Sequence, residues 1–179
     1  MKQSENVKMK LWLTMASLMV SSMATSASTR AKHVQWFRSP DGALRVSVRS
    51  VSQDCPETRL TISSTTKGII YRKDFSSSDC EHGSSFIRGE WTPDSGFFVF
   101  SIESTGGHQP GHKPVLFYNR VESTLYRLED FIGYIVAQDF SLKAPHNLQT
   151  EKQLSTGSAD GIRIEVDLSR VGRRMRRAT

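Results

Sequence analysis

The 179-residue chain lacks the short motifs that mark the commonest enzyme classes. It has no GxSxG nucleophile elbow, no HExxH zinc-binding pair, no P-loop and no glycine-rich dinucleotide-binding turn. What remains for acid–base chemistry is a set of carboxylates near the ends of expected strands: Glu103, Glu122, Asp130 and Asp139. Acids in such places are usually solvated, so the sequence assigns no catalytic residue and no cofactor, and it favours a binding protein over an enzyme.

Helical periodicity is missing as well. Beyond the first 27 residues no window repeats its apolar residues at the spacing of an amphipathic helix, although residues 122–130 have room for one helical turn. Most segments alternate instead: Leu44, Val46 and Val48 are separated by arginine and serine. Alternation of this kind predicts strands whose two faces differ. The other segments of this type are 59–63, 68–75, 95–104, 114–120, 123–130, 133–142, 146–154 and 161–168.

The expected strands fall into two kinds. Residues 43–49 and 162–168 are apolar on one face only, whereas residues 97–100 and 115–118 are apolar on both faces. A strand with one apolar face leaves its other face in water, and a strand with two is sandwiched. The sequence therefore predicts a central hairpin covered on both sides by the terminal segments. Its predicted core comprises Phe98, Phe100, Ile102, Val115, Phe117, Leu125 and Ile135.

The N-terminal region has the order of a secretory signal peptide. Three lysines precede an apolar run over residues 11–20, and small residues follow up to Ala27. This order predicts cleavage after Ala24 or Ala27, and hence a periplasmic or extracellular protein. The alternative is an uncleaved membrane anchor, but the apolar run is well short of the ~20 residues that a span needs. We therefore expect a leader at 1–27, a β domain at 28–168 and a basic tail at 169–179, with no stable membrane span after cleavage.

The expected domain has no excess of positive charge. The chain has a formal net charge of +6, but three lysines and one glutamate lie in the leader and five arginines in the tail, which leaves −1 for residues 28–168. A nucleic-acid-binding face across the fold is therefore not expected. The tail is predicted to be disordered, with an electrostatic contact to anionic envelope material as the alternative.

Cysteine is nearly absent, since the chain has only Cys55 and Cys80. An even count in an oxidising compartment predicts one disulfide between them, with two separate buried thiols as the alternative. Neither cysteine lies in a CxxC pair, so a metal site built on them is not expected.

A weak internal repeat is visible. The segment FRSPDGALRVSV (37–48) is similar to EWTPDSGFFVFSI (90–102), and SADGIRIEV (158–166) is a fainter version. In the two clear copies Pro-Asp and glycine predict a turn, because proline presets φ, aspartate binds its own backbone and glycine adopts positive φ. The two copies are 53 residues apart, which suits one four-stranded unit and predicts propeller-like blades.

The block WTPDSGFFVF, which begins at Trp91, resembles the WSPDG-plus-strand signature of the WD40-like, PD40-type repeats of periplasmic β-propeller proteins. The resemblance covers the two clear copies and the fainter third, and it implies a role as an interaction platform. Removing the leader leaves about 150 residues, fewer than four blades of ~40–45 residues need. We therefore expect an all-β fold of two or three blade-like antiparallel sheets packed as an open stack or sandwich, not a closed propeller.

One connection is longer than a hairpin needs. The segment STGGHQPGHKP (104–114) joins the two apolar strands, and long ordered loops tend to carry binding sites. Its predicted contact residues are His108, Gln109, His112 and Lys113, together with Trp91 at the same hairpin. The tryptophan is either a stacking platform for sugar or peptide, or a cover packed over the hairpin. The alternative for the loop is a solvent-facing connection.

The two histidines of this loop do not by themselves form a metal site. Their i, i+4 spacing serves a metal only on a helix, and three glycines and two prolines exclude a helix here. His82, with Glu81 or Glu103, would complete a site only if the fold brought it near, so no metal is expected.

Together these features predict an exported, non-catalytic, propeller-like binding or envelope-associated module. Its partner would be a protein or an envelope polysaccharide, and not a nucleic acid. The alternative is a small secreted hydrolase or enzyme inhibitor that uses the 104–114 loop.

Overall fold

The computed structural model describes residues 34–106, 112–135, 139–154 and 160–175, and this part of the chain forms three antiparallel sheets. The predicted all-β class is therefore confirmed. In the described ranges no sheet closes into a barrel or a propeller. The predicted leader at 1–27 lies outside the described residues.

Each sheet is a simple meander along the chain. The N-terminal sheet consists of β1 (Val34–Arg38), β2 (Leu44–Ser50), β3 (Thr58–Ser64) and β4 (Gly68–Asp74), in that order. The central sheet repeats the pattern with β5 (Ser84–Trp91), β6 (Phe97–Ser104), β7 (Val115–Asn119) and β8 (Thr124–Arg127). The C-terminal sheet has the order β11-β10-β9, from β9 (Ser141–Lys143), β10 (Asn147–Gln153) and β11 (Gly161–Asp167). Helix α1 (Glu129–Ile132) follows β8, and helix α2 (Leu168–Met175) follows β11.

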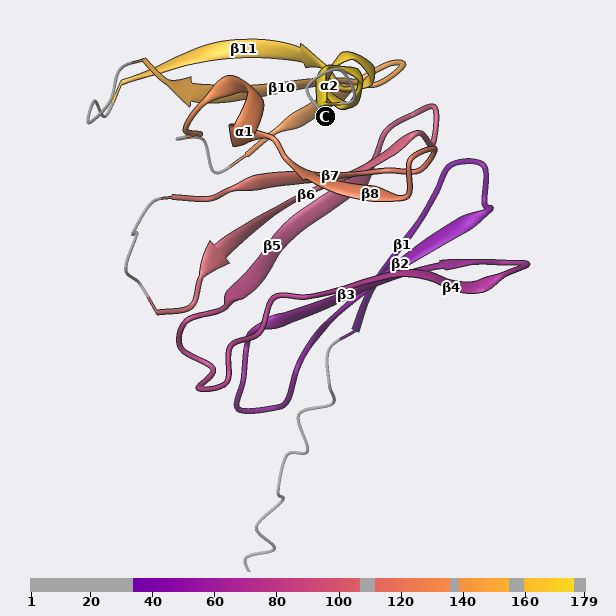
Figure 1. Ribbon diagram of the computed structural model, residues 1–179, viewed down its shortest axis with the longest axis vertical. Helices are drawn as coiled ribbons and strands as arrows, with labels where there is room; N and C mark the ends of the chain where they lie inside the picture. Colours follow the sequence, from indigo (N-terminus) through magenta and orange to yellow (C-terminus); the bar gives the residue numbers. More distant parts are fainter. Residues whose placement is uncertain (1–33, 107–111, 136–138, 155–159, 176–179) are drawn as a thin grey trace, which may run out of the picture.

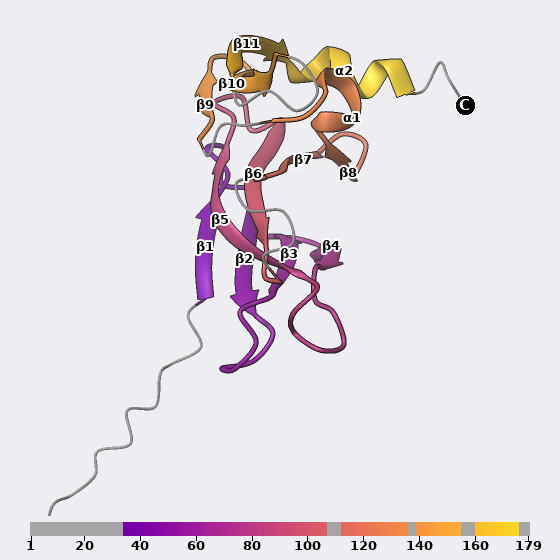
Figure 2. The ribbon, with the colours of Figure 1, turned by 90° about the vertical axis from the view of Figure 1, so that its left-hand side faces the viewer.

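The three sheets lie in layers, with the central sheet between the other two (Figure 1 and Figure 2). A first core, which includes Val46 and Phe98, fills the space between the N-terminal and central sheets. A second core lies on the opposite face of the central sheet and joins it to the C-terminal sheet and both helices, through residues such as Val99, Leu148 and Leu168. The predicted open stack is thus the observed architecture. None of the helices in the described ranges has the length and apolar character to cross a membrane.

Strand β6 accounts for this arrangement. Residues 97–102 are all buried, and the apolar even-numbered ones belong to the first core while the apolar odd-numbered ones belong to the second. Strand β7 is buried along its whole length and pairs with β6 so that Phe98 lies opposite Tyr118. Burial on both faces fixes this register, because a slip of one residue would move every side chain to the other face. The prediction of a sandwiched central hairpin is confirmed.

Six of the seven predicted core residues are buried, and Leu125 is only partly buried. It lies on β8, the edge strand of the central sheet, and packs against the first core from one side. The fully buried leucine of this region is Leu128, which directly follows β8 and belongs to the second core.

The two clear copies of the sequence repeat form turns with the same hydrogen bonds. In the first turn the hydroxyl of Ser39 donates to Asp41 Oδ1 at 2.6 Å, and in the second the hydroxyl of Thr92 donates to Asp94 Oδ1 at 2.6 Å. Each hydroxyl also accepts the first amide of the strand that follows, at 3.0 Å in both turns. The sequence repeat therefore corresponds to a repeated local structure.

The turns of neighbouring sheets bind one another and form a row. The backbone N–H of Asp41 donates to Ser95 Oγ at 3.0 Å, and the backbone N–H of Asp94 donates to the carbonyl of Pro145 at 3.4 Å. The third member of the row is thus the β9–β10 turn at 144–146. This turn lies apart from the faint third copy at 158–166, of which the described part runs into β11. The third turn was missed because it keeps the proline but has no Asp-Gly pair.

The expected basic tail overlaps a helix. Residues 169–175 belong to helix α2. Leu168 and Val171 lie three positions apart, on one side of the helix, and both are buried in the second core. These two apolar side chains therefore dock the first turn of α2 on the second core. Residues 176–179 lie outside the described part of the chain.

Candidate functional site

The predicted contact loop is described only at its two ends, up to Gly106 and again from residue 112. His108 and Gln109 lie outside the described residues, so their contact role stays a prediction. Lys113 is partly buried, and its Nζ lies 3.6 Å from Glu103 Oε2 at the end of β6. This ion pair ties the returning end of the loop to the strand from which the loop departs.

His112 is an anchor of this loop and not a surface contact. It is 7 % exposed, its Nε2 lies 2.6 Å from Glu129 Oε1, and its ring stacks on Tyr134 with centroids 4.2 Å apart. The same carboxylate accepts the backbone N–H of Ile135 at 3.1 Å and the Nε–H of Arg127 at 2.9 Å. Burial, and to a lesser extent the charge of Glu129, raise the pKa of Tyr134. The predicted exposed histidine is therefore part of a buried polar cluster.

A cleft of about 300 Å³ opens beside this anchor. It is lined by Phe75, Ser84, Ile102, Ser104, His112, Pro114, Leu116 and Arg127. Both of its titratable side chains, His112 and Arg127, already bind Glu129. The cleft therefore has the character of a small, largely apolar depression.

Three of the four acids that the sequence offered for catalysis have separate partners. Glu103 pairs with Lys113, and Asp139 Oδ1 lies 3.2 Å from Arg88 Nη1. Glu122 accepts the hydroxyl of Tyr126. In the described ranges these acids therefore form no carboxylate pair of the kind that acid–base hydrolysis uses.

Trp91 does not belong to the predicted contact surface, which corrects the sequence-based expectation. It is 6 % exposed, its Nε1–H donates to the carbonyl of Phe37 at 3.2 Å, and its ring centroid lies 5.4 Å from that of Phe98. Trp91 pairs with Phe98 at the start of β6, whereas the loop follows the end of β6. The tryptophan therefore covers the first core at the opposite end of the sheet from the loop.

Cys55 and Cys80 form a disulfide with Cα atoms 5.3 Å apart, so the predicted bridge is present in the structure. Cys55 precedes β3 and Cys80 lies between β4 and β5. The bridge therefore closes the region where the chain passes from the N-terminal sheet to the central sheet.

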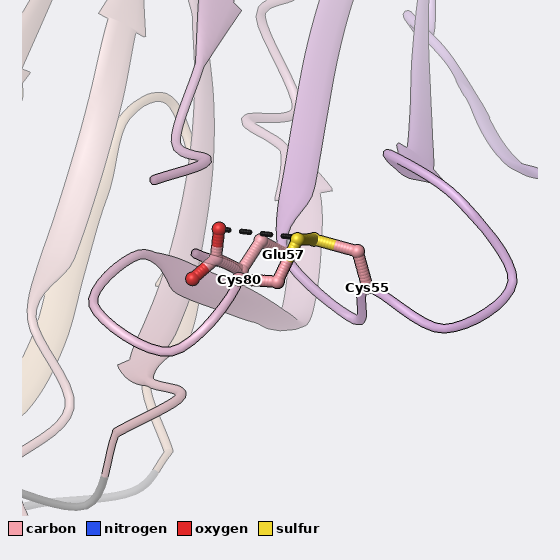
Figure 3. A group of neighbouring side chains, drawn as sticks. All are labelled: Cys55, Glu57 and Cys80. Atoms are coloured by element: carbon pink, nitrogen blue, oxygen red, sulfur yellow. Dashed lines mark hydrogen bonds between the residues drawn. A yellow bond between two sulfur atoms is a disulfide. The ribbon is translucent and has the colours of Figure 1, made fainter. Parts of the chain in front are cut away.

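A buried carboxylate lies beside this disulfide, with Glu57 Oε2 at 3.8 Å from Cys55 Sγ (Figure 3). Glu57 is 0 % exposed and accepts hydrogen bonds from Ser77 N–H (2.6 Å), Ser77 Oγ (2.8 Å), Gly83 N–H (2.5 Å) and Thr105 Oγ1 (2.8 Å). Burial opposes ionisation, but these hydrogen bonds outweigh it and lower the pKa of Glu57. A side chain on Gly83 would not fit, because its Cβ would lie 2.4 Å from Glu57 Cδ.

The atoms of Cys55, Glu57 and Cys80 lie within 4.8 Å of one another, as metal ligands would. The two sulfurs are bonded to each other, however, so neither is a thiolate that could bind a metal. The carboxylate oxygens are occupied by the four donors named above. The cluster is therefore a structural clip that joins β3, the segment leading into β5, and the end of β6.

The outer face of the N-terminal sheet carries the most distinctive surface chemistry of the described chain. On β2, Val46 and Val48 enter the first core, so Arg45 and Arg49 point outward. Antiparallel pairing places further arginines on this face, because residues directly opposite each other share a face. The set, called the arginine face below, comprises Arg38, Arg45, Arg49, Arg59 and Arg72, with Trp36 and Asp74.

Within the arginine face, like charges lie directly across from one another. Arg38 is opposite Arg45, and Arg49 is opposite Arg59. The one acid, Asp74, accepts the Nε–H of Arg59 at 2.8 Å. Hydrogen bonds from Ser76 and Arg59 lower the pKa of Asp74 although partial burial opposes them, so it is ionised at neutral pH. Four arginines remain that Asp74 does not neutralise.

An aromatic side chain lies on the same face. Trp36 is 54 % exposed, and the guanidinium carbon of Arg45 lies 4.3 Å from its ring centroid. This distance is that of a cation–π contact, in which the cation is attracted to the face of the ring. Ser47 is opposite both Trp36 and Thr61, so a row of small hydroxyl side chains separates the two arginine pairs.

Sequence reasoning missed this face because it added up the charge of the whole domain. The net charge of the domain is close to zero, although five arginines and only one acid lie on this face, because most of its acids lie elsewhere. The signal was present in the alternation of β2, where arginine and serine occupy every second position. What the sequence did not supply is the pairing of β2 with β1 and β3, which brings the other arginines to the same side.

Comparisons with protein-family models, with curated proteins and with solved structures find no match to this chain. The case for its function therefore rests on its own residues.

Proposed function

We propose that this protein is an exported, non-catalytic binding module whose partner docks on the arginine face. The observation that carries the proposal is the set of cross-strand arginine pairs on a sheet face that no described element covers. Like charges directly opposite each other destabilise a sheet. Their presence on the exposed side of a stable stack favours a role in binding an anionic partner over a structural role.

The N-terminal sequence pattern and the disulfide support the exported location. Positively charged residues followed by an apolar run and then by small residues are typical of a secretory leader. Disulfides persist in oxidising compartments. The resemblance of the turn motif to periplasmic propeller repeats agrees with this location and with a role as an interaction platform. Both remain proposals for this chain.

A retention assay tests the proposal. The protein and its Arg45→Gln/Arg49→Gln variant are incubated with the envelope fraction of the source cells, and the bound fraction is measured after sedimentation. We expect the variant's retention to fall about tenfold, because two charge-assisted contacts are lost. The matched control is Lys143→Gln/Arg163→Gln, which removes the same charge from two exposed residues of the C-terminal sheet.

Two outcomes contradict the proposal. Equal loss of retention in both double variants would show that binding responds only to net charge. Unchanged retention of the arginine-face variant would exclude this face as the contact. An additional variant with residues 107–111 shortened to Asn-Gly tests the predicted loop separately, and retention lost in that variant alone would favour the loop.

A further inference from the structure

We infer that the partner of the arginine face is a linear acidic polysaccharide, that is, a sugar chain bearing carboxylate or sulfate groups. The inference rests on the proposed function and names the chemistry that this surface recognises. It draws on three features of the face: the choice of arginine, the spacing of the arginine pairs, and the surface between them.

The cations of this face are arginines rather than lysines. A guanidinium is planar and presents paired N–H donors that match the two oxygens of a carboxylate or sulfate. A lysine ammonium acts as a point charge and does not impose that geometry. A surface built from arginines is therefore suited to discrete oxyanions at fixed positions, in addition to general attraction of negative charge.

The arginine pairs occupy two separate positions along the sheet. Arg45 and Arg49 are four residues apart on β2, about 13–14 Å along the strand. Arg38 extends the first position across β1, and Arg59 extends the second across β3. An occupant must therefore supply negative groups repeatedly along its length, as an acidic polymer does.

The row between the two positions carries hydroxyls, with an aromatic ring at one end and Arg72 at the other. Ser47 and Thr61 are small, so a chain that crosses this row meets short side chains between the two arginine pairs. The indole of Trp36 offers an apolar surface with a polar N–H, which fits the apolar face and the hydroxyl groups of a sugar ring. Hydroxyls, one exposed indole and spaced guanidinium groups together match an acidic sugar chain.

Nucleic acids fit this face less well. Sheet proteins that bind single strands stack two or three bases on aromatic side chains, and the described arginine face has one exposed aromatic side chain. Duplex DNA is read by elements that enter a groove, whereas this face is a broad sheet surface. The inference thus agrees with the sequence-based expectation that nucleic acid is not the partner.

The test measures binding of the purified, disulfide-bonded protein to defined probes by calorimetry at two salt concentrations. The probes are polygalacturonate, heparin, neutral dextran, a single-stranded thymidine oligonucleotide and phosphatidylglycerol vesicles. We expect binding to at least one of the two acidic polysaccharides, and no binding to dextran. Arg45→Gln/Arg49→Gln should weaken it at least about tenfold, with Lys143→Gln/Arg163→Gln within about twofold of the wild type. Trp36→Ala should weaken it severalfold without changing the salt dependence, because the indole contributes no charge.

Protection mapping gives a second readout that needs no variant. Bound polysaccharide should slow modification of Arg45 and Arg49 by phenylglyoxal, as measured by mass spectrometry, and leave that of Arg163 unchanged. A chain ending at Met175 should bind as the full chain does, which excludes the terminal arginines as the source.

The results separate the inference from the proposed function. If neither acidic polysaccharide binds while envelope retention still depends on Arg45 and Arg49, the inference is wrong and the proposed function stands. If the oligonucleotide or the vesicles bind more tightly than both polysaccharides, the inference is also wrong. If envelope retention does not depend on this face, both are wrong.

Discussion

The central sheet is joined to its two neighbours in different ways. The buried side chains of both contacts are mostly aliphatic. In the contact with the N-terminal sheet, rings from the two layers also meet, and hydrogen bonds and a disulfide lie at its two ends. The contact with the C-terminal sheet instead adds charged groups, several of them near the row of turns. The same strand, β6, supplies buried side chains to both contacts, so the difference lies in what meets it.

On the N-terminal side, rings interlock across the sheets. Phe37 lies 5.3 Å from Phe98 and Phe75 lies 5.9 Å from Phe100, measured between ring centroids. The backbone bond from Asp41 fastens one end, and the disulfide with the Glu57 clip fastens the other. This side therefore combines dispersion, hydrogen bonding and a covalent constraint.

On the C-terminal side, His146 connects the turn row to the end of β11. Its Nδ1 lies 2.7 Å from Asp94 Oδ2 and its Nε2 lies 3.2 Å from Asp167 Oδ1. Asp167 also accepts from Arg170 at 3.1 Å. A further ion pair joins Arg88 of β5 to Asp139. Contacts of this kind depend on ionisation, so acid should weaken them.

The largest expected effect comes from breaking the aromatic contact. Phe100→Ala should lower the free energy of unfolding by ~3–5 kcal/mol, because the side chain is fully buried and leaves a cavity. Urea unfolding followed by fluorescence measures the change. Val121→Ala, at a position 89 % exposed, should change it by less than about 0.5 kcal/mol. A loss below about 1 kcal/mol for Phe100→Ala would contradict the central role of β6.

Removal of the covalent tie should have a slightly smaller effect. The Cys55→Ser/Cys80→Ser variant should lose roughly 3–4 kcal/mol of unfolding free energy, because its unfolded chain is no longer constrained. Equilibrium unfolding with and without reductant gives the comparison, and the double variant should not respond to reductant. If mass spectrometry finds two free thiols in the native protein, Cys55 and Cys80 do not form a disulfide and this prediction is wrong.

Undocking of helix α2 should weaken only the C-terminal side. Val171→Ala removes two methyl groups from a side chain that is 6 % exposed, and it should cost about 1–2 kcal/mol. Thermal unfolding monitored by circular dichroism provides the measurement, with the exposed Arg163→Ala as the control. No difference between the two variants would mean that α2 contributes nothing to the second core.

The smallest expected effect is on pH dependence. Burial opposes ionisation of Asp94, but hydrogen bonds from Thr92, Gly96 and His146 lower its pKa below the usual value. A carboxylate with a lowered pKa stabilises the fold above its unfolded pKa, and this contribution disappears as the pH falls below about 4. Asp94→Asn should therefore lose stability at pH 7, by less than about 1 kcal/mol, and lose less than the wild type on acidification to pH 3.

The control for this acid experiment is Asp130→Asn, an exposed residue of α1. Its variant should follow the wild-type pH profile. An Asp94→Asn profile that is parallel to the wild type would show that the ion pair does not link stability to pH.

The layered fold could be predicted because the relevant information is local. Alternation in β2 and β11 and two-sided burial in β6 and β7 each follow from a few consecutive residues. Strand β5 was missed because polar residues and a glycine interrupt its pattern. Gly89 is required there by tertiary packing, since a Cβ would lie 2.6 Å from the ring of Phe98. Such a requirement appears only once β5 and β6 are paired.

The candidate site could be predicted only in part, because it depends on which strands become neighbours. The loop histidine at 112 looked exposed, but its partner Glu129 comes from a helix after β8. Trp91 looked like a platform at a turn, but its indole N–H donates to the carbonyl of Phe37 in another sheet. The arginine face required the register of three strands. In each case the deciding contact joins residues that are distant in sequence.

The row of turns also determines how the stack can open. Asp41 and Asp94 each donate a backbone N–H to the next sheet, so the three layers cannot slide along the strand direction without breaking these bonds. We expect the C-terminal layer to open by moving away from β6 and β7, because its contacts with the central sheet include charged groups at the surface. Amide hydrogens of β9 and β11 should therefore exchange with solvent through this partial opening, whereas those of β6 and β7 exchange only when the whole domain unfolds.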